Sequence, residues 1–494
     1  MKNNLLRHLL SVALLCLISS TLFAQLFIKN NFELEIAHAG DNYRVLPLSS
    51  GNIFLLFQEN KGSGANIRSV LLDDRLRLKW EKDTPLGAKG GLIGLTEDLG
   101  FGYALFRGTD SQYILLKIDL EKGEVEKSIC PNDHDMDISH FEVVNGNVLA
   151  GGELDGKAFA LKYRPGSGKL PTILFHNLYE KSELRSINVD RKVGVVNFFL
   201  TSPMRSAEQV FYFNTFDLKG NSLERYKLDM GTDFRLLTYQ VGIVEQDEFV
   251  VIGNYGVKKV YEDNSHGVYS AHIGKRMVKA TRYYDFGRLK SYFSFLEDKK
   301  KERVLRKIAV SRKKKKPFKS PYVLEARPLS YGEQQFIFTA STHKYFPHPA
   351  RATYTYLSSF SCGFDKKGRL VWDKAIPYKG RAMVTPQPFE LTAAGLAEGR
   401  VAVLQKLDGV MRYNFTAKKE YDPKIQIALW PSEKRDDIDE YVMAEELVHL
   451  FAGKFLRYAI CEKVDRKNPA KSRIVFSVSS IEAENNGFTA DKKL

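Results

Sequence analysis

The sequence predicts an all-β protein, an eight-bladed β-propeller with seven blades as the alternative count. Three observations support this prediction: short strand-like runs fill the chain, turn residues separate them, and the pattern recurs about every 46–55 residues. The chain has 494 residues, of which 44% are hydrophobic, so it can bury several core layers and is too apolar to be disordered. This composition excludes a collagen-like chain, an acidic halophile-type surface and a small disulfide-dense scaffold.

The first segment, residues 1–24, is predicted to be a secretory signal peptide. Lys2 and Arg7 begin a basic start, a short apolar run follows, and Ala24 supplies the small residue before the expected cleavage site. A lipoprotein is disfavoured because Leu15, which is not small, precedes Cys16. No later apolar run is long enough to span a membrane. We therefore expect an exported protein that is periplasmic, outer-membrane-associated or secreted.

Strand-like runs rich in β-branched and aromatic residues extend through the mature chain. They include residues 52–57, 113–118, 148–150, 158–163, 195–200, 249–252, 336–338 and 474–478. Asp155-Gly156 separates two of them and predicts a tight hairpin, because both central residues of that turn take positive φ. The second strands of eight repeat units are predicted to begin near Gly51, Gly100, Gly146, Val193, Glu248, Gly332, Gly399 and Gly453.

Two of the repeat units match in detail. Residues 73–82 align with residues 365–374 without a gap, so that Asp, Arg, Leu, Trp and Lys coincide. Weaker matches of the same turn are Asp119 with Gly123 and Asp217 with Gly220. A turn that leads into a final strand at this period is typical of a propeller blade.

The domain boundaries follow from this repeat. We expect the propeller over residues 25–482, a basic insertion over 286–320 and a C-terminal tail over 483–494. The last unit offers only three strands, and residues 26–36 supply a strand that no other unit claims. We expect this N-terminal strand to pair with the last unit, which would close the ring and remove open sheet edges.

The repeated Asp-x-x-Gly-x-Leu-x-Trp hairpin end, complete at Asp365–Trp372, resembles that of exported bacterial β-propellers of the quinoprotein-like and kelch-like repeat group. The resemblance covers most of residues 26–480 as a style of repeat. It implies a propeller fold but no particular activity, because that group includes enzymes, sugar binders and assembly scaffolds. We therefore carry over no cofactor from it.

The net charge of +15 is concentrated in one segment. Residues 287–320 contain fourteen Lys and Arg against three Asp and Glu, a net charge of +11. Lys2 and Arg7 leave with the predicted signal peptide, so the rest of the mature chain carries only +2. The excess charge therefore belongs to a local insertion and not to the protein surface as a whole.

We expect the basic insertion to be partly helical and to contact an anionic partner at the cell envelope. Apolar residues recur in it at helical spacing: Leu289, Tyr292, Phe293 and Leu296. The cations expected to bind the partner are Lys299, Lys300, Lys301, Arg303, Arg306, Lys307, Arg312, Lys313, Lys314, Lys315 and Lys316. Lipid head groups, an acidic polysaccharide or an acidic protein would fit them, whereas export argues against nucleic acid. The alternative is a solvated arm with no dedicated partner.

A second group of ionisable residues is expected to line the propeller mouth, where loops from neighbouring blades meet. Its members are Asp133, His134, Asp135, Asp137, His176, His343 and His348, the last two in a predicted loop over residues 341–352. The alternating carboxylates Asp133, Asp135 and Asp137 could hold Ca²⁺, but a solvated acidic turn is the preferred interpretation because the EF-hand pattern fails. We expect no other cofactor or metal.

The absence of serine-hydrolase, P-loop, dinucleotide and HExxH motifs favours a non-enzymatic binding or scaffold protein. The alternative is a hydrolase or lyase that acts on an acidic polysaccharide at the mouth, which needs carboxylates or histidines from different blades within about 10 Å. Cys130, Cys362 and Cys461 are expected to be buried single thiols, with one disulfide plus one free thiol as the alternative.

Overall fold

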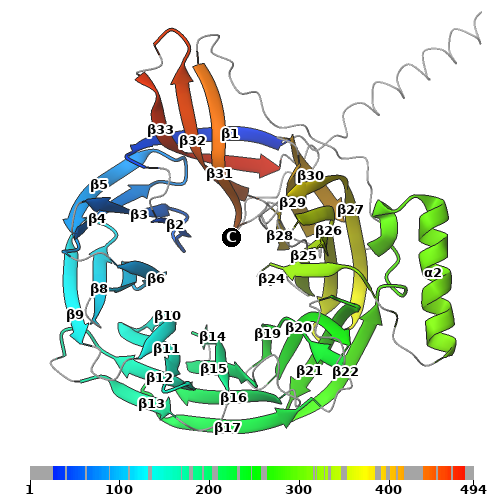
Figure 1. Cartoon of the computed structure of the whole chain (residues 1–494). Coiled ribbons are helices and arrows are strands. Elements are labelled where there is room, and N and C mark those ends of the chain that lie inside the picture. The colour runs from blue at the N-terminus through cyan, green and yellow to red at the C-terminus, as the bar shows by residue number, and fades with distance from the viewer. Residues whose placement is uncertain are drawn as a thin grey trace, which may run out of the picture. The chain divides into compact units, whose positions relative to one another are not determined.

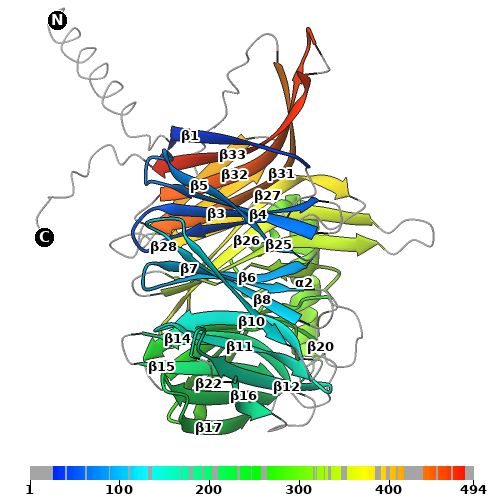
Figure 2. The same cartoon turned by 90° about the vertical axis from the view of Figure 1, so that its left-hand side faces the viewer.

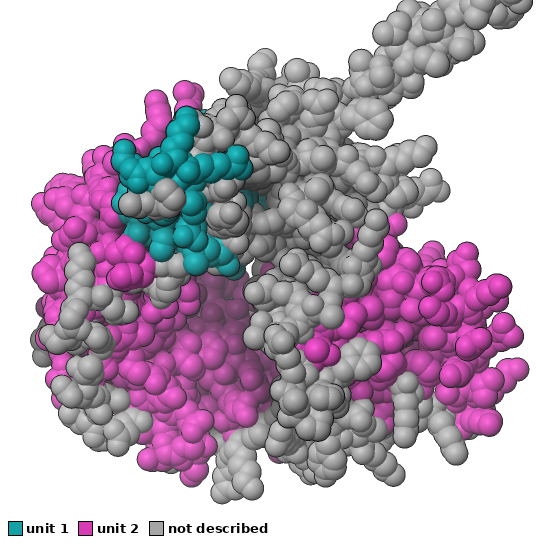
Figure 3. Space-filling model, turned by 45° about the horizontal axis from the view of Figure 1, so that its top comes forward, with its two compact units in different colours: residues 1–36, 330–337, 388–494 teal, residues 37–329, 338–387 magenta. Residues whose placement is uncertain are grey.

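The computed structural model describes residues 26–483 except for gaps between strands, of which the longest are 203–209, 258–263, 347–352, 384–390 and 417–437. The described strands form eight sheets, and the chain divides into two compact units (Figure 3). Unit 1 comprises residues 1–36, 330–337 and 388–494, and unit 2 comprises residues 37–329 and 338–387. The predicted signal peptide and C-terminal tail, except for residue 483, lie outside the described residues.

Unit 2 contains five successive sheets and most of a sixth, which we number blades 1–6 (Figures 1 and 2). Blade 1 consists of β2 (Asn42–Pro47), β3 (Ile53–Lys61), β4 (Gly64–Leu72) and β5 (Leu78–Pro85), and blade 2 of β6 (Gly91–Asp98), β7 (Phe101–Arg107), β8 (Gln112–Asp119) and β9 (Val125–Pro131). Blade 3 consists of β10 (Asp137–Val144), β11 (Asn147–Leu154), β12 (Lys157–Tyr163) and β13 (Thr172–His176), and blade 4 of β14 (Glu183–Asp190), β15 (Val195–Thr201), β16 (Val210–Asp217) and β17 (Ser222–Asp229).

Blades 5 and 6 have five strands each and flank the helical insertion. Blade 5 consists of β18 (Phe234–Leu236), β19 (Gln240–Glu245), β20 (Glu248–Val257), β21 (Gly267–Gly274) and β22 (Met277–Asp285). Blade 6 consists of β23 (Val323–Ala326), β24 (Ser330–Tyr331), β25 (Gln335–Phe346), β26 (Thr353–Asp365) and β27 (Leu370–Met383), with residues 330–337 belonging to unit 1. Between the blades lie the 3₁₀-helix η1 (Tyr292–Phe295) and the α-helix α2 (Asp298–Lys313).

Unit 1 contains the two remaining sheets. One has three described strands, β28 (Leu391–Gly395), β29 (Val401–Leu407) and β30 (Val410–Thr416). The other has the order β1-β33-β32-β31 and is formed by β1 (Leu26–Ile36), β31 (Ile438–Phe451), β32 (Lys454–Asp465) and β33 (Arg473–Ala483). The predicted pairing of the N-terminal strand with the last unit is therefore confirmed, since β1 runs antiparallel to β33.

The blades form because their middle strands are buried on both faces. All seven residues of β15 and all eight of β21 are buried, whereas the outer strands β5 and β17 alternate exposed with half-buried positions. Four hydrophobic clusters each join one blade to the next, from blades 1 and 2 through blades 4 and 5. Burying one large apolar side chain stabilises a fold by about 1.5–3 kcal/mol, so each pair of blades shares a substantial core.

The predicted repeat is confirmed at its turns. Asp73 Oδ1 accepts hydrogen bonds from the backbone N–H groups of residues 75 and 77, and Asp365 Oδ1 accepts them from residues 367 and 369. Asp119 and Asp217 bind the backbone of their own turns in a similar way. The predicted Asp155-Gly156 hairpin is also present, with φ of 51° and 72°.

The predicted number of blades is not supported, although the all-β propeller fold is. All eight predicted second strands exist, but among the described residues seven sheets have the four or five strands of a blade, which matches the alternative count of seven. The sheet β28–β30 has three strands among the described residues. The predicted number of blades was too high because spacing and strand pattern identify the second strand of a unit but do not specify its fourth strand.

Two further sequence predictions are settled by the fold. Cys130, Cys362 and Cys461 lie on the strands β9, β26 and β32 and none is in a disulfide, as the preferred interpretation expected, although Cys130 is only partly buried. The loop predicted over 341–352 is wrong in its first half, because residues 341–346 continue β25. The polar residues Thr342 and His343 concealed this strand, since they are buried there without making it apolar.

Candidate functional site

The basic insertion is held to unit 2 at both ends. At its start, the Asp373 carboxylate on β27 accepts hydrogen bonds from the backbone N–H groups of Lys290 and Ser291, at 3.0 and 2.7 Å. At its end, Arg312 of α2 donates to the Asp285 carboxylate at the end of β22, with Nε 3.2 Å from Oδ2. The insertion therefore begins and ends on charged anchors, and α2 is fixed alongside the sheets (Figure 1).

An aromatic cluster packs beneath these anchors. The Tyr292 ring is fully buried and stacks on the Phe286 ring, with centroids 3.7 Å apart. Its edge also meets the Phe360 ring of β26, at 5.4 Å between centroids. The predicted helical spacing in this region yields only the single turn η1, because Leu296 has extended backbone and separates η1 from α2.

One side of α2 faces the protein and the other faces solvent. Ile308 is 3% exposed, and its methyl group lies where a Cβ on Gly287 would come within 2.8 Å. Lys301, Val304 and Leu305 are half-buried on the same side. Because an α-helix turns about 100° per residue, the positions opposite Ile308 form a separate outward face.

The outward face of α2 is basic. Six exposed cations of α2, together with Lys314 directly after its last residue, lie within an arc of about 140° when the helix is extended by that one residue: Lys299, Lys300, Arg303, Arg306, Lys307, Lys313 and Lys314. The helix carboxylates Asp298 and Glu302 lie outside this arc, and Val310 is the one apolar residue inside it. We call these seven residues the basic face.

Two members of the basic face form ion pairs with neighbouring carboxylates, but these pairs are too exposed to prevent either cation from binding another anion. Lys300 Nζ lies 3.1 Å from Glu297 Oε2, and Arg306 Nη2 lies 3.5 Å from Glu302 Oε2. All four side chains are at least 66% exposed, and such surface pairs contribute about 0–1 kcal/mol. An approaching anion can therefore exchange for either carboxylate at little cost.

The remaining predicted partner-binding residues have other positions. Lys301 is half-buried on the inward side, and Arg312 is engaged with Asp285. Lys315 and Lys316 lie outside the described residues.

Two of the predicted mouth residues, Asp137 and His176, lie at opposite edges of one blade. Asp137 begins β10 and forms an exposed ion pair with Arg107, whereas His176 ends β13 at the other edge of the same blade. Two strands lie between β10 and β13, which separates their backbones by about 14 Å. Asp133, His134, Asp135 and His348 lie outside the described residues.

His343 belongs to blade 6 and is buried, with 5% of its surface exposed. Its ring packs against Tyr354 and Tyr356, at centroid distances of 5.6 and 5.1 Å. Nδ1 has no hydrogen-bond partner among the described residues. Burial lowers the pKa of His343 to about 4, so the imidazole is neutral at neutral pH and adds no positive charge.

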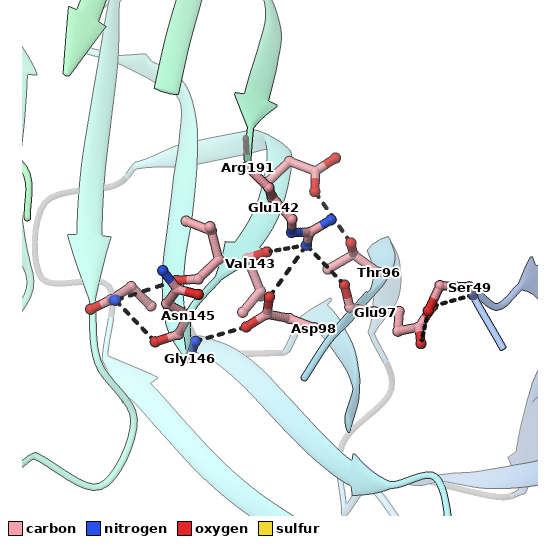
Figure 4. A network of polar contacts seen from close by, with 11 residues as sticks. Ser49, Thr96, Glu97, Asp98, Glu142, Val143, Asn145, Gly146 and Arg191 are labelled. Carbon is pink, nitrogen blue, oxygen red and sulfur yellow. Dashed lines mark hydrogen bonds and ion pairs between the residues drawn. The ribbon is translucent and has the colours of Figure 1, made fainter. Parts of the chain in front are cut away.

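A polar network that the sequence did not indicate joins the first turns of blades 1–4 (Figure 4). Arg191, between β14 and β15, extends its Nη2 to the backbone oxygens of Glu97 and Val143, both at 3.1 Å, and to Asp98 Oδ1 at 3.3 Å. Asp98 Oδ2 also accepts a hydrogen bond of 2.8 Å from the backbone N–H of Gly146. We call this group the Arg191 network.

The Arg191 network extends to blade 1 and to Glu142. Ser49 donates from its backbone N–H and its hydroxyl to the two oxygens of the Glu97 carboxylate, at 2.8 and 2.9 Å. The Thr96 hydroxyl donates to Glu142 Oε2 at 3.2 Å, and burial raises the pKa of Glu142. One signal could have revealed this network: Ser49 and Glu97, Asp98 and Gly146, and Val143 and Arg191 are each 48 residues apart, which is one repeat.

Among the residues that the structure describes, no three or more His, Cys, Asp or Glu side chains are grouped to hold a metal ion. Within the same residues, no helix is long and apolar enough to cross a membrane. The calcium hypothesis rests on Asp133 and Asp135, which lie outside them.

The sheets and their repeated turns define an all-β protein of the β-propeller class. No protein-family model matches the chain, and no curated protein matches its sequence. It is similar to the polysaccharide lyase Uly1, with 8% identity, 79% of this chain and 90% of that chain covered, and a TM-score of 0.41.

Two further solved structures are similar at the same low level. For a prolyl endopeptidase the identity is 8%, the coverage 87% of this chain and 54% of that chain, and the TM-score 0.41. For the β-propeller domain of the trilobed protease from Pyrococcus furiosus the identity is 9%, the coverage 82% of this chain and 99% of that chain, and the TM-score 0.35. Because every TM-score is below 0.5, these likenesses do not bear on the activity of this chain.

Proposed function

We propose that this protein is an exported β-propeller that binds an anionic partner through the basic face of α2. The observation that carries the proposal is the division of α2 into two sides: Ile308 holds one side to the protein while seven cations occupy the other. The contacts with Asp373 and Asp285 hold the insertion to unit 2, so α2 presents these cations on an ordered element. The basic start and apolar run of residues 1–24 support export.

The electrostatics of the chain also support this role. The net charge of the mature chain outside residues 287–320 is only +2, so an anion meets one localised source of attraction. Each cation near an anionic surface is worth about 1 kcal/mol and less as salt rises. Several cations acting together are therefore needed for useful affinity, and α2 presents them on one rigid element.

An enzymatic role has no comparable support from the described residues. Asp137 is paired with Arg107, His176 lies at the far edge of the same blade, and His343 is buried in another blade. The hydrolase or lyase alternative would need these groups to converge on one substrate.

The test compares the mature protein with the triple variant Lys299→Gln/Arg303→Gln/Lys307→Gln. The probes are polygalacturonate and phosphatidylglycerol vesicles, each measured at low and at high salt. We expect at least one probe to bind the unaltered protein, and the variant to lose most of that binding. Equal binding by both proteins, or no binding to either probe at low salt, would contradict the proposal.

The matched control is Lys79→Gln/Lys122→Gln/Lys227→Gln, which removes three exposed lysines from blades of unit 2, two on strands and one in the turn between β8 and β9. It lowers the net charge by the same amount as the first variant. If the control loses as much affinity as the α2 variant, net charge and not the basic face governs binding, and the proposal fails.

A further inference from the structure

The cations of the basic face lie in rows along the helix. Lys299, Arg303 and Lys307 follow one another at intervals of four residues. With a rise of about 1.5 Å per residue, these positions recur every 6 Å or so, and the row extended to Lys314 spans about 22 Å. The basic face is therefore a long, narrow array and not a compact cluster.

The same face is unsuited to entering a lipid bilayer. Helices that bind membranes bury an apolar side in the lipid. Here Ile308 is 3% exposed against the protein, and the outward face offers only Val310, which is 50% exposed. Contact with a bilayer would therefore be limited to head groups, which diffuse freely and do not require evenly spaced cations.

The array is also fixed before any partner binds. The carboxylates of Asp373 and Asp285 hold the two ends of the insertion, and Ile308 packs against Gly287. Binding therefore orders the Lys and Arg side chains but not the backbone of α2, which favours a partner whose charges are themselves regularly spaced. Arg303 and Arg306 add planar guanidinium groups, which pair with carboxylates through two parallel hydrogen bonds.

Resting on the proposed function, we infer that the anionic partner is a linear carboxylated polysaccharide that lies along α2. Its regularly spaced carboxylates meet the row Lys299–Arg303–Lys307 and continue toward Lys314. The predicted export places the protein where such polymers occur and away from nucleic acid.

The experiment measures the affinity of the mature protein for galacturonate oligomers of increasing length, with phosphatidylglycerol vesicles and a single-stranded DNA oligomer as competing classes of anion. We expect affinity to rise with oligomer length until the oligomer matches the span of the row. The α2 triple variant should bind the longest oligomer about 10- to 100-fold more weakly, and the lysine control on the blades should be unchanged.

The experiment distinguishes a failure of this inference from a failure of the proposed function. If vesicles or DNA bind more tightly than every oligomer, or if the dimer binds as tightly as the longest oligomer, the inference is overturned and the proposed function stands. If no anionic probe binds, or if the control and the α2 variant lose equally, the inference and the proposed function both fail.

Discussion

Replacing Arg191 with methionine tests whether the Arg191 network holds blades 2–4 together. The substitution keeps much of the side-chain volume and removes the guanidinium. It breaks the hydrogen bonds to the backbone oxygens of Glu97 and Val143 and the ion pair with Asp98. The Asp98 side chain is only 3% exposed and, among the residues that the structure describes, would keep the hydrogen bond from Gly146.

The expected loss in the free energy of unfolding depends on how deeply each partner of the ion pair is buried. Removing one partner of a fully buried pair costs about 3–5 kcal/mol. Arg191 is 56% exposed, so water already reaches the pair and reduces the cost. We expect a loss of about 2 kcal/mol in the free energy of unfolding, from the unpaired Asp98 and the lost backbone hydrogen bonds.

The assay is a double-mutant cycle of Arg191→Met and Asp98→Asn, followed by urea denaturation and by Tm. The asparagine still accepts the Gly146 hydrogen bond, so the coupling isolates the ion pair. We expect a coupling energy of about 1 kcal/mol or more. Arg306→Met is the matched control, because its pair with Glu302 is exposed on both sides and should contribute almost nothing. Coupling near zero, or an equal loss in the control, would refute the reasoning.

Three other predictions concern pH, packing and processing. The pKa of His343 is about 4 in the folded protein and near 6.5 in the unfolded chain, so the stability that the neutral buried imidazole contributes is complete above pH 6.5 and is lost as the pH falls toward 4. The protein should therefore lose about 2 kcal/mol in its free energy of unfolding between pH 7 and pH 5. The variant His343→Gln should not show this loss, and urea midpoints at the two pH values measure it. Trp80 Nε1 donates to the Leu120 oxygen at 3.0 Å, so Trp80→Phe should lower the free energy of unfolding by about 1 kcal/mol, and an unchanged midpoint would contradict this. Mass spectrometry of the exported protein should find Gln25 at its N-terminus, and an intact Met1 would exclude the signal peptide.

The strands were predictable from the sequence because local composition and turn chemistry agree in each unit. Asp365 and its turn residues show the agreement, since one carboxylate binding its own backbone suffices to end one strand and start the next. The exact number of blades was not predictable, because the strand pattern identifies the second strand of each unit and leaves its fourth strand unspecified. One long-range pairing was predictable, that of residues 26–36, because this strand belonged to no repeat unit and the last unit lacked a strand.

The candidate site was predictable only where charge is concentrated in a short segment. The cations of α2 are adjacent in sequence, and helical periodicity assigns them to a face. The Arg191 network escaped notice because it joins single residues from four turns, and no one turn is unusual on its own. His343 was assigned to a loop because a buried strand rich in hydroxyl groups lacks the apolar pattern that identifies strands.

The joining of β1 to β33 sets an order of events for assembly. Glu33 is bound by Lys463, and Asn31 by Ser477 and Ser479, so partners more than 400 residues apart must meet. During synthesis β1 therefore remains without this partner until residues 473–483 have been made. During that interval its free edge is open to other chains. Truncation before residue 473 would make this exposure permanent, and we expect such a fragment to aggregate even where the other blades are intact.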